Sequence, residues 1–258
     1  MSSLAERIER ARPLRQTRAW TSARLAACNT ALQSNRLWPL AVAALLGFQF
    51  LLIFTHQPWL DEYQALQIAV EAPDLATMAQ WLAYEGHPPL WYLLLRGLAY
   101  LMDPLWTLPV AAALCAIAMQ GAVLFASPFN RIERLLIAAS QFVLFEYLTI
   151  SRSLSLGGAA MFAAMALWRS RAVWIAIAVL PMCDFLFGVV SVGLAAMKLR
   201  ERDLWRPGVA LWVVSGLLAA WSVIPAVDAE PAIASGNPLV ELAFWASTMA
   251  TCSSPCKA

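Results

Sequence analysis

Apolar runs of about membrane-spanning length constrain the fold of this chain more than any other feature of its sequence. Leu37–Thr55 comprises nineteen residues without a charge, with Gln49 and the terminal Thr55 as its polar side chains. A helix needs about 20 residues to cross the roughly 30 Å apolar layer of a bilayer. The whole chain is 61% hydrophobic and only 13% charged over 258 residues, which leaves too few polar side chains to cover a soluble globule. The sequence therefore predicts an all-α, polytopic transmembrane helical bundle of seven or eight spans.

The later apolar runs are separated by short polar breaks, and their charges suggest how the chain crosses the membrane. If every run crosses once, the break that holds Arg131 and Arg134 lies outside, against the positive-inside tendency. If the first of these runs, which carries Arg96, only dips into the membrane, the breaks 127–134, 169–171 and 198–206 are all cytoplasmic. We prefer the second topology, which puts Arg152 and Asp184 on the outer face. The runs are Pro88–Met102, Pro104–Ala126, Leu135–Ile150, Leu154–Trp168, Ala172–Met182, Phe185–Met197 and Pro207–Val227.

Charge is distributed unevenly on the two sides of the first predicted span. Residues 1–36 carry seven Arg against two Glu, whereas the interval 57–87 carries five acidic residues and no Lys or Arg. Basic flanks stay cytoplasmic, so we expect the N-terminus inside and the interval 57–87 outside. The basic segment is either a helix lying on the inner leaflet or a plain positive tail.

The outer interval 57–87 is predicted to form short amphipathic helices along the membrane surface. Pro73-Asp74 is typical of a helix start, apolar residues then recur on one face, and Gly86 is a typical stop. Trp59 and Trp81 are candidate interfacial anchors. The predicted organisation is thus a basic segment 1–36, a transmembrane domain 37–250 with the outer loop 57–87, and an irregular tail 251–258.

Two polar motifs lie near the two ends of this loop. Asp61-Glu62 follows about five residues after the first span, and His87-Pro88-Pro89 opens the next apolar run. Here the sequence resembles the GT-C superfamily of membrane glycosyltransferases that use lipid-phosphate-linked sugars, and within it the family 39-type protein O-mannosyltransferases and aminoarabinose transferases. Such proteins are usually about twice as long, so the resemblance covers their N-terminal half, and we expect an incomplete domain or a shifted reading frame near the end.

The resemblance implies roles for several residues. Asp61 would be the base that accepts the acceptor's proton, with Glu62 in support. Arg152, in Ser151-Arg152-Ser153, resembles the second motif of the family, and its guanidinium suits bidentate phosphate contact. Leu154 stands where many relatives have Tyr, and no Asp follows. Glu146 and Asp184 are the nearby substitutes for this missing acidic position. The implied substrate-binding residues are His87, Arg152, Glu146 and Asp184.

Structural readings of these residues stay open. Asp61 and Glu62 could simply cap the loop helix, and His87 could be a structural histidine at the interface. An anionic partner is expected for Arg152 because a charge among apolar runs is expensive. That partner is either the donor's phosphate or a protein carboxylate such as Glu146 or Asp184.

Three functions compete at this level. The first is a hexosyl- or pentosyltransferase of a bacterial-type inner (plasma) membrane, with membrane lipid and a polyprenyl-phosphate sugar as partners and no nucleic acid. The second is a non-catalytic remnant or assembly partner, and the third is a transporter. The five scattered Cys predict no zinc site and no disulfide framework. No metal site is predicted, although a divalent cation at the second acidic position stays open.

Overall fold

The computed structural model describes residues 27, 30, 37–201 and 205–224, and all secondary structure in this part of the chain is helical. The all-α prediction is thereby confirmed. The chain divides into two units, Met1–Ile224 and Pro225–Ala258, and every element described below belongs to the first. Most of the basic segment 1–36, the end of the predicted transmembrane domain after residue 224 and the tail 251–258 lie outside the described residues.

Two of the described helices are long and apolar enough to cross a membrane. Helix α2 (Leu37–Thr55) has the bounds predicted from the sequence. Helix α6 (Pro104–Gly121) continues through a π-helical turn, Ala122–Ala126, to the predicted end of its run. It begins sharply because the Asp103 carboxylate accepts the Leu105 N–H and a proline follows at the first helical position.

The other apolar helices are shorter. At 1.5 Å per residue, the fourteen residues of α8 extend about 21 Å, well short of a roughly 30 Å apolar layer. The expectation of seven or eight spans therefore stays a prediction, since two helices of the described residues reach spanning length. The shorter helices are α5 (Leu90–Ala99), α8 (Ser153–Ala166), α9 (Val173–Cys183), α10 (Phe185–Arg200) and α11 (Arg206–Ser222).

The run Leu135–Ile150, expected as one membrane segment, is instead divided. Helix α7 (Arg131–Ala138) ends within the run at Ala138, and a π-helical turn, Phe142–Tyr147, follows. The Ser140 hydroxyl donates to the Ile137 carbonyl and accepts the Val143 N–H, so local bonds replace part of the helical ladder. The chain beyond this break leads directly into the segment 149–153, which forms part of the candidate site.

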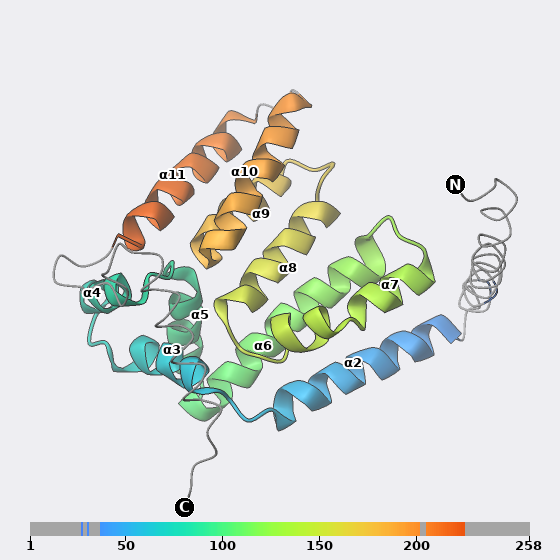
Figure 1. Cartoon of the computed structure of the whole chain (residues 1–258), viewed down its shortest axis with the longest axis horizontal. Coiled ribbons are helices and arrows are strands. Elements are labelled where there is room, and N and C mark those ends of the chain that lie inside the picture. The colour runs from blue at the N-terminus through green and yellow to red at the C-terminus, as the bar shows by residue number, and fades with distance from the viewer. Residues whose placement is uncertain (1–26, 28–29, 31–36, 202–204, 225–258) are drawn as a thin grey trace, which may run out of the picture. The chain divides into compact units, whose positions relative to one another are not determined.

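Helix α9 is the centre of the second half of the unit, where α8, α10 and α11 all pack against it (Figure 1). Trp174 of α9 is fully buried there. Helix α11 approaches this side chain closely at Gly208, where an added Cβ would lie 2.5 Å from Trp174 Cβ. A glycine is therefore required at this crossing.

Helices α3 (Leu60–Glu71), α4 (Leu75–Glu85) and α5 gather at one end of the unit, as Figure 1 shows. The sequence predicted one or two short helices in the outer loop, and the structure has two, with the predicted limits of α4. Asp74 caps α4 by accepting the Thr77 N–H at 2.7 Å, and this bond holds the pKa of the Asp74 carboxyl below its ordinary value. Gly86 ends α4 in the left-handed conformation with φ 66°.

Arg96 of α5 stabilises the end of α3. Its guanidinium donates to the carbonyls of Ala69 (3.0 Å) and Ala72 (2.7 Å), the last of which follows α3 directly. These carbonyls at the end of α3 lack helical donors, and a cation beside them is electrostatically favourable.

Candidate functional site

Three segments converge beside the start of α5. They are the first turn of α3, the turn between α4 and α5, and the segment 149–153 that leads into α8. Asp61, His87 and Arg152 come one from each and line a single cavity of about 90 Å³, here called the Arg152 pocket. The structure therefore brings together three residues that the sequence placed in the site from positions up to 91 residues apart.

Arg152 forms an ion pair with Asp61, with 2.5 Å between Nε and Oδ2. The two side chains are 31% and 49% exposed, and the guanidinium also lies over the Trp59 ring, 5.0 Å from its centroid. The Arg152 guanidinium is thus paired with the Asp61 carboxylate and with the face of an aromatic ring.

The expectation that a protein carboxylate partner of Arg152 would be Glu146 or Asp184 was wrong. Asp184 is engaged elsewhere, since its carboxylate caps α10 by accepting the Leu186 N–H at 2.9 Å and faces the Ser153 hydroxyl at 3.4 Å. Glu146 lies in the π-helical turn before the segment 149–153 and does not line the Arg152 pocket. Arg152 precedes the first residue of α8 in an extended conformation, and its side chain meets α3.

Glu62, next to Asp61, is in the opposite environment. Its side chain is fully buried, and its carboxylate accepts the backbone N–H of Trp59 at 2.8 Å and that of Ser151 at 2.7 Å. The first bond completes the start of α3, and the second joins α3 to the residue before Arg152. Glu62 therefore fixes the relative positions of Asp61 and Arg152, which is a supporting role.

His56 is a site residue that the sequence reasoning missed. Its Nε2 lies 2.9 Å from Glu62 Oε2, and its ring packs against Trp59 and, edge on, against Phe145. His56, Glu62 and Ser151 line a second polar cavity of about 290 Å³, the His56 pocket, on the other side of the Glu62 carboxylate. The one sequence signal was a histidine directly after a span and six residues before an acid.

His87 is oriented by the turn that precedes α5. Its Nδ1 is 2.8 Å from the Glu85 carbonyl oxygen, which can only accept, so Nδ1 carries a proton. Nε2 is then available as an acceptor when the ring is neutral, or as a second donor when it is protonated. Both rim residues, Glu85 and His87, line the Arg152 pocket.

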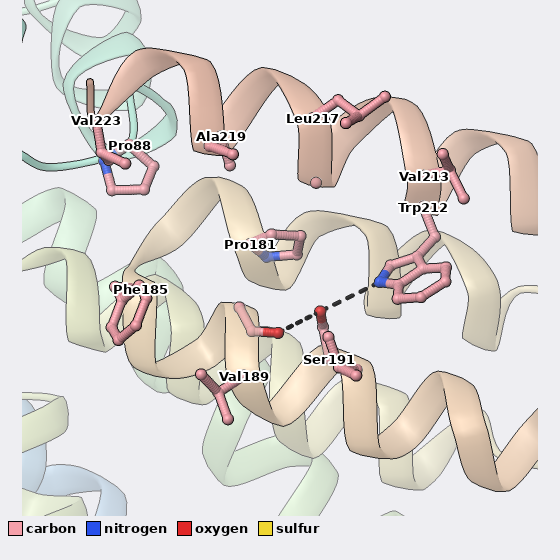
Figure 2. Close-up of a pocket in the computed structure, with 14 residues that line it drawn as sticks. Pro88, Pro181, Phe185, Val189, Ser191, Trp212, Val213, Leu217, Ala219 and Val223 are labelled. Atoms are coloured by element: carbon pink, nitrogen blue, oxygen red, sulfur yellow. Dashed lines mark hydrogen bonds between the residues drawn. The ribbon is translucent and has the colours of Figure 1, made fainter.

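A large apolar groove of about 430 Å³ lies beside this pocket, between α10 and α11 and against Pro181 of α9 (Figure 2). Its few polar groups are bonded to one another: Trp212 Nε1 donates to Ser191 Oγ at 3.2 Å, and the Ser191 hydroxyl donates to the Gly188 carbonyl. Pro88 lines the groove and the preceding residue, His87, lines the Arg152 pocket. Two residues adjacent in the sequence thus line a charged pocket and an apolar groove.

The described residues include no group of three or more His, Cys, Asp or Glu side chains that could hold a metal ion. Comparison of the chain with protein-family models, curated proteins and solved structures finds no match. The geometry of the two pockets and the groove, together with the sequence motifs, is therefore the basis for the functional argument.

Proposed function

We propose that the protein is an integral membrane glycosyltransferase of the GT-C type that transfers a sugar from a polyprenyl-phosphate donor to an acceptor at the outer face of the membrane. The observation that carries the proposal is that consecutive residues, His87 and Pro88, line the Arg152 pocket and the apolar groove respectively. A lipid-linked sugar phosphate has an anionic head and a long hydrocarbon tail. It requires a cationic polar site that continues into an apolar channel.

The exposed surface supports a polytopic bundle in a membrane. Only 22% of the most apolar window of α2 is buried inside the unit. An apolar helix that exposes most of its surface is unusual on a soluble monomer and is typical of a surface that contacts lipid or a partner. Exposed large apolar side chains recur on α2, α10 and α11, among them Leu40, Phe48, Leu51, Phe185, Leu186, Val192, Leu217 and Trp221.

The distribution of charged contacts supports the preferred topology. Lys198 Nζ donates to the Trp168 carbonyl at 3.1 Å, which ties together the two breaks that were assigned to the cytoplasm, 169–171 and 198–206. Asp61 and Arg152, both assigned to the outer face, form an ion pair. We accordingly propose an inner (plasma) membrane of the bacterial type with a cytoplasmic N-terminus.

The chemistry assigns a role to each charged group. The bond between the sugar's anomeric carbon and the phosphate oxygen breaks, and the acceptor's hydroxyl oxygen forms a bond to that carbon. Asp61 takes the hydroxyl proton, and its half-exposed carboxylate is accessible for this role. Arg152 stabilises the charge on the departing lipid phosphate, with His87 beside it. Asp61 exchanges its contact with Arg152 for the acceptor when the donor binds.

The test is donor consumption by the purified full-length chain. The protein in detergent micelles is incubated with a panel of polyprenyl-phosphate hexoses and pentoses, and the remaining donor and released lipid phosphate are quantified by mass spectrometry. We expect one donor to be consumed, with loss of turnover in Asp61→Asn. Binding without turnover across the panel would favour the non-catalytic alternative, and absence of both would contradict the proposal.

A further inference from the structure

Two buried tryptophans in the part of the chain that the structure describes have an indole N–H without an acceptor. Trp91 of α5 is 1% exposed and Trp174 of α9 is 0% exposed. A buried donor without a partner is uncommon in folded proteins because it loses its bond to water and gains nothing in return. Trp174 lies in the core between α9 and α11, whereas Trp91 lines the Arg152 pocket.

The surroundings of Trp91 favour an anionic ligand. Arg152, whose guanidinium carries five N–H donors, lines the same pocket. Trp91 and Tyr92 line the pocket from the first turn of α5, which is the positive end of that helix. The carboxylates of Asp61 and Glu85 also line it, and the first is already paired with Arg152. The Trp91 indole N–H and the guanidinium of Arg152 are the donors that this pocket offers to a ligand with its own acceptor oxygens.

The pocket is large enough for such a ligand. A single water needs about 10–15 Å³ of comparable space, whereas the pocket measures about 90 Å³. A group of several heavy atoms, such as a phosphate, can enter without displacing a helix. One phosphate oxygen could then accept the indole N–H while another meets the guanidinium.

We infer that Trp91 is a further substrate-binding residue, whose indole N–H donates to an oxygen of a phosphate group held in the Arg152 pocket. The identity of the group as the head of a lipid-linked donor rests on the proposed function. The phosphate chemistry itself is shared by a lipid headgroup and by free phosphate. None of the described residues supplies an acceptor for this donor, and a phosphate oxygen would supply it.

Titration calorimetry on the full-length chain in detergent tests the inference with three probes: farnesyl phosphate, inorganic phosphate and farnesol. Trp91→Phe keeps an aromatic ring and removes the N–H, and Trp174→Phe is the matched control because it removes an equally buried, equally unpaired donor away from the pocket. We expect Trp91→Phe to weaken farnesyl phosphate binding about 10- to 150-fold, the range for one hydrogen bond to a charged group. Trp174→Phe should bind as wild type does.

Each result has a defined consequence. If Trp91→Phe and wild type bind with equal affinity, or if Trp174→Phe loses as much affinity as Trp91→Phe, the inference is overturned and the proposed function stands. If the wild type binds neither farnesyl phosphate nor inorganic phosphate, both are overturned. If binding depends on Trp91 but the protein consumes no donor, the proposed function alone is overturned. Inorganic phosphate bound with the same dependence identifies the phosphate group as sufficient, and preference for farnesyl phosphate identifies the lipid. If Trp91→Phe does not fold, 3-benzothienylalanine at position 91 keeps the bicyclic ring without the N–H.

Discussion

The Arg152 pocket and the apolar groove differ in whether their polar groups have hydrogen-bond partners within the protein. In the groove, Ser191 and Trp212 bond to each other, and the Ser215 hydroxyl donates to the Ala178 carbonyl behind it. In the pocket, Trp91 Nε1 has no hydrogen-bond acceptor among the described residues. A surface whose polar groups are already paired is suited to hydrocarbon, and one that keeps buried donors unpaired is suited to a polar ligand. The difference supports two adjoining sites for the two halves of an amphipathic substrate.

The largest expected effect belongs to Asp61. We expect Asp61→Asn to lower the rate of sugar transfer about 10²- to 10⁴-fold, the range for loss of a general base. Its side chain is half exposed, so the fold should persist. Donor consumption and thermal stability are the measurements. Glu71→Gln is the control, because Glu71 is an exposed carboxylate on the same helix that bonds only to Gln67 among the described side chains. Transfer at the wild-type rate would place the base elsewhere.

Glu62→Gln should affect stability where Asp61→Asn affects rate. The amide of Gln keeps one acceptor oxygen and replaces the other by an NH₂ group. One of the two backbone N–H groups that Glu62 accepts, that of Trp59 or that of Ser151, then faces a donor and loses its hydrogen bond. We expect a loss of about 1–3 kcal/mol in the free energy of unfolding, as for other buried unsatisfied groups. Denaturant titration measures it against Glu71→Gln. An unchanged stability would mean that Glu62 does not hold α3 to the segment 149–153.

Arg152 separates ligand binding from stability. Arg152→Leu should weaken farnesyl phosphate binding about 10- to 100-fold, since a charge-assisted pair is lost, and Arg152→Lys should recover only part of the affinity. Because the ion pair with Asp61 is partly exposed, its loss should cost at most about 1 kcal/mol of stability. A strongly destabilised Arg152→Leu whose folded fraction still binds the probe normally would make Arg152 structural.

The groove can be filled without touching the pocket. Gly216 of α11 lines the groove, and a Cβ added there meets nothing within 4 Å. We expect Gly216→Leu to weaken farnesyl phosphate binding several-fold and to leave inorganic phosphate binding unchanged, because the new side chain occupies the space for the tail. Gly193→Leu on α10 is the matched control, since its surroundings are equally open and it does not line the groove. Equal losses in both variants would remove the groove from the lipid site.

The smallest effect concerns the cap of α4, outside both regions. The pKa of Asp74 is lowered from its ordinary 3.8 by the Thr77 N–H, so the charged cap stabilises the folded state at neutral pH. This contribution is present above the unfolded-state pKa and disappears as the pH falls through the lower folded-state pKa. Asp74→Asn keeps an acceptor without a charge, so its stability should lack this acid-side dependence. Circular dichroism melts between pH 3 and pH 6 compare the two, and identical profiles would contradict the assignment.

The sequence predicted the parts of the structure that depend on neighbouring residues. The bounds of α2 followed from a run without charges, and α4 followed from Asp74 at its start and Gly86 at its end. These signals act within one helix or one turn, so they can be read without knowledge of the fold. The division of the run 135–150 was missed because Ser140 redirects the backbone through its own hydroxyl bonds.

The candidate site could be predicted in part of its members and not in its pairings. Asp61, His87 and Arg152 were named from the sequence and line one pocket, whereas Glu146 and Asp184 do not line it and the partner of Arg152 was not predicted. Glu62 bonds to a backbone N–H 89 residues away, at Ser151, and a contact over that separation leaves no local pattern in the chain. His56 was missed for the same reason, since its environment exists only after α3 and the segment 149–153 have come together.

The most direct test of the account is whether one lipid occupies the pocket and the groove together. A polyprenyl phosphate with a photoreactive diazirine in its tail is crosslinked to the full-length chain, and the modified peptides are mapped by mass spectrometry. The account predicts adducts on groove residues of α10 and α11, such as Val192 and Leu217, which are lost with Arg152→Leu and with the uncharged alcohol of the same tail. Labelling confined to the exposed face of α2, or groove labelling that is unchanged by Arg152→Leu and by removal of the phosphate, would contradict it.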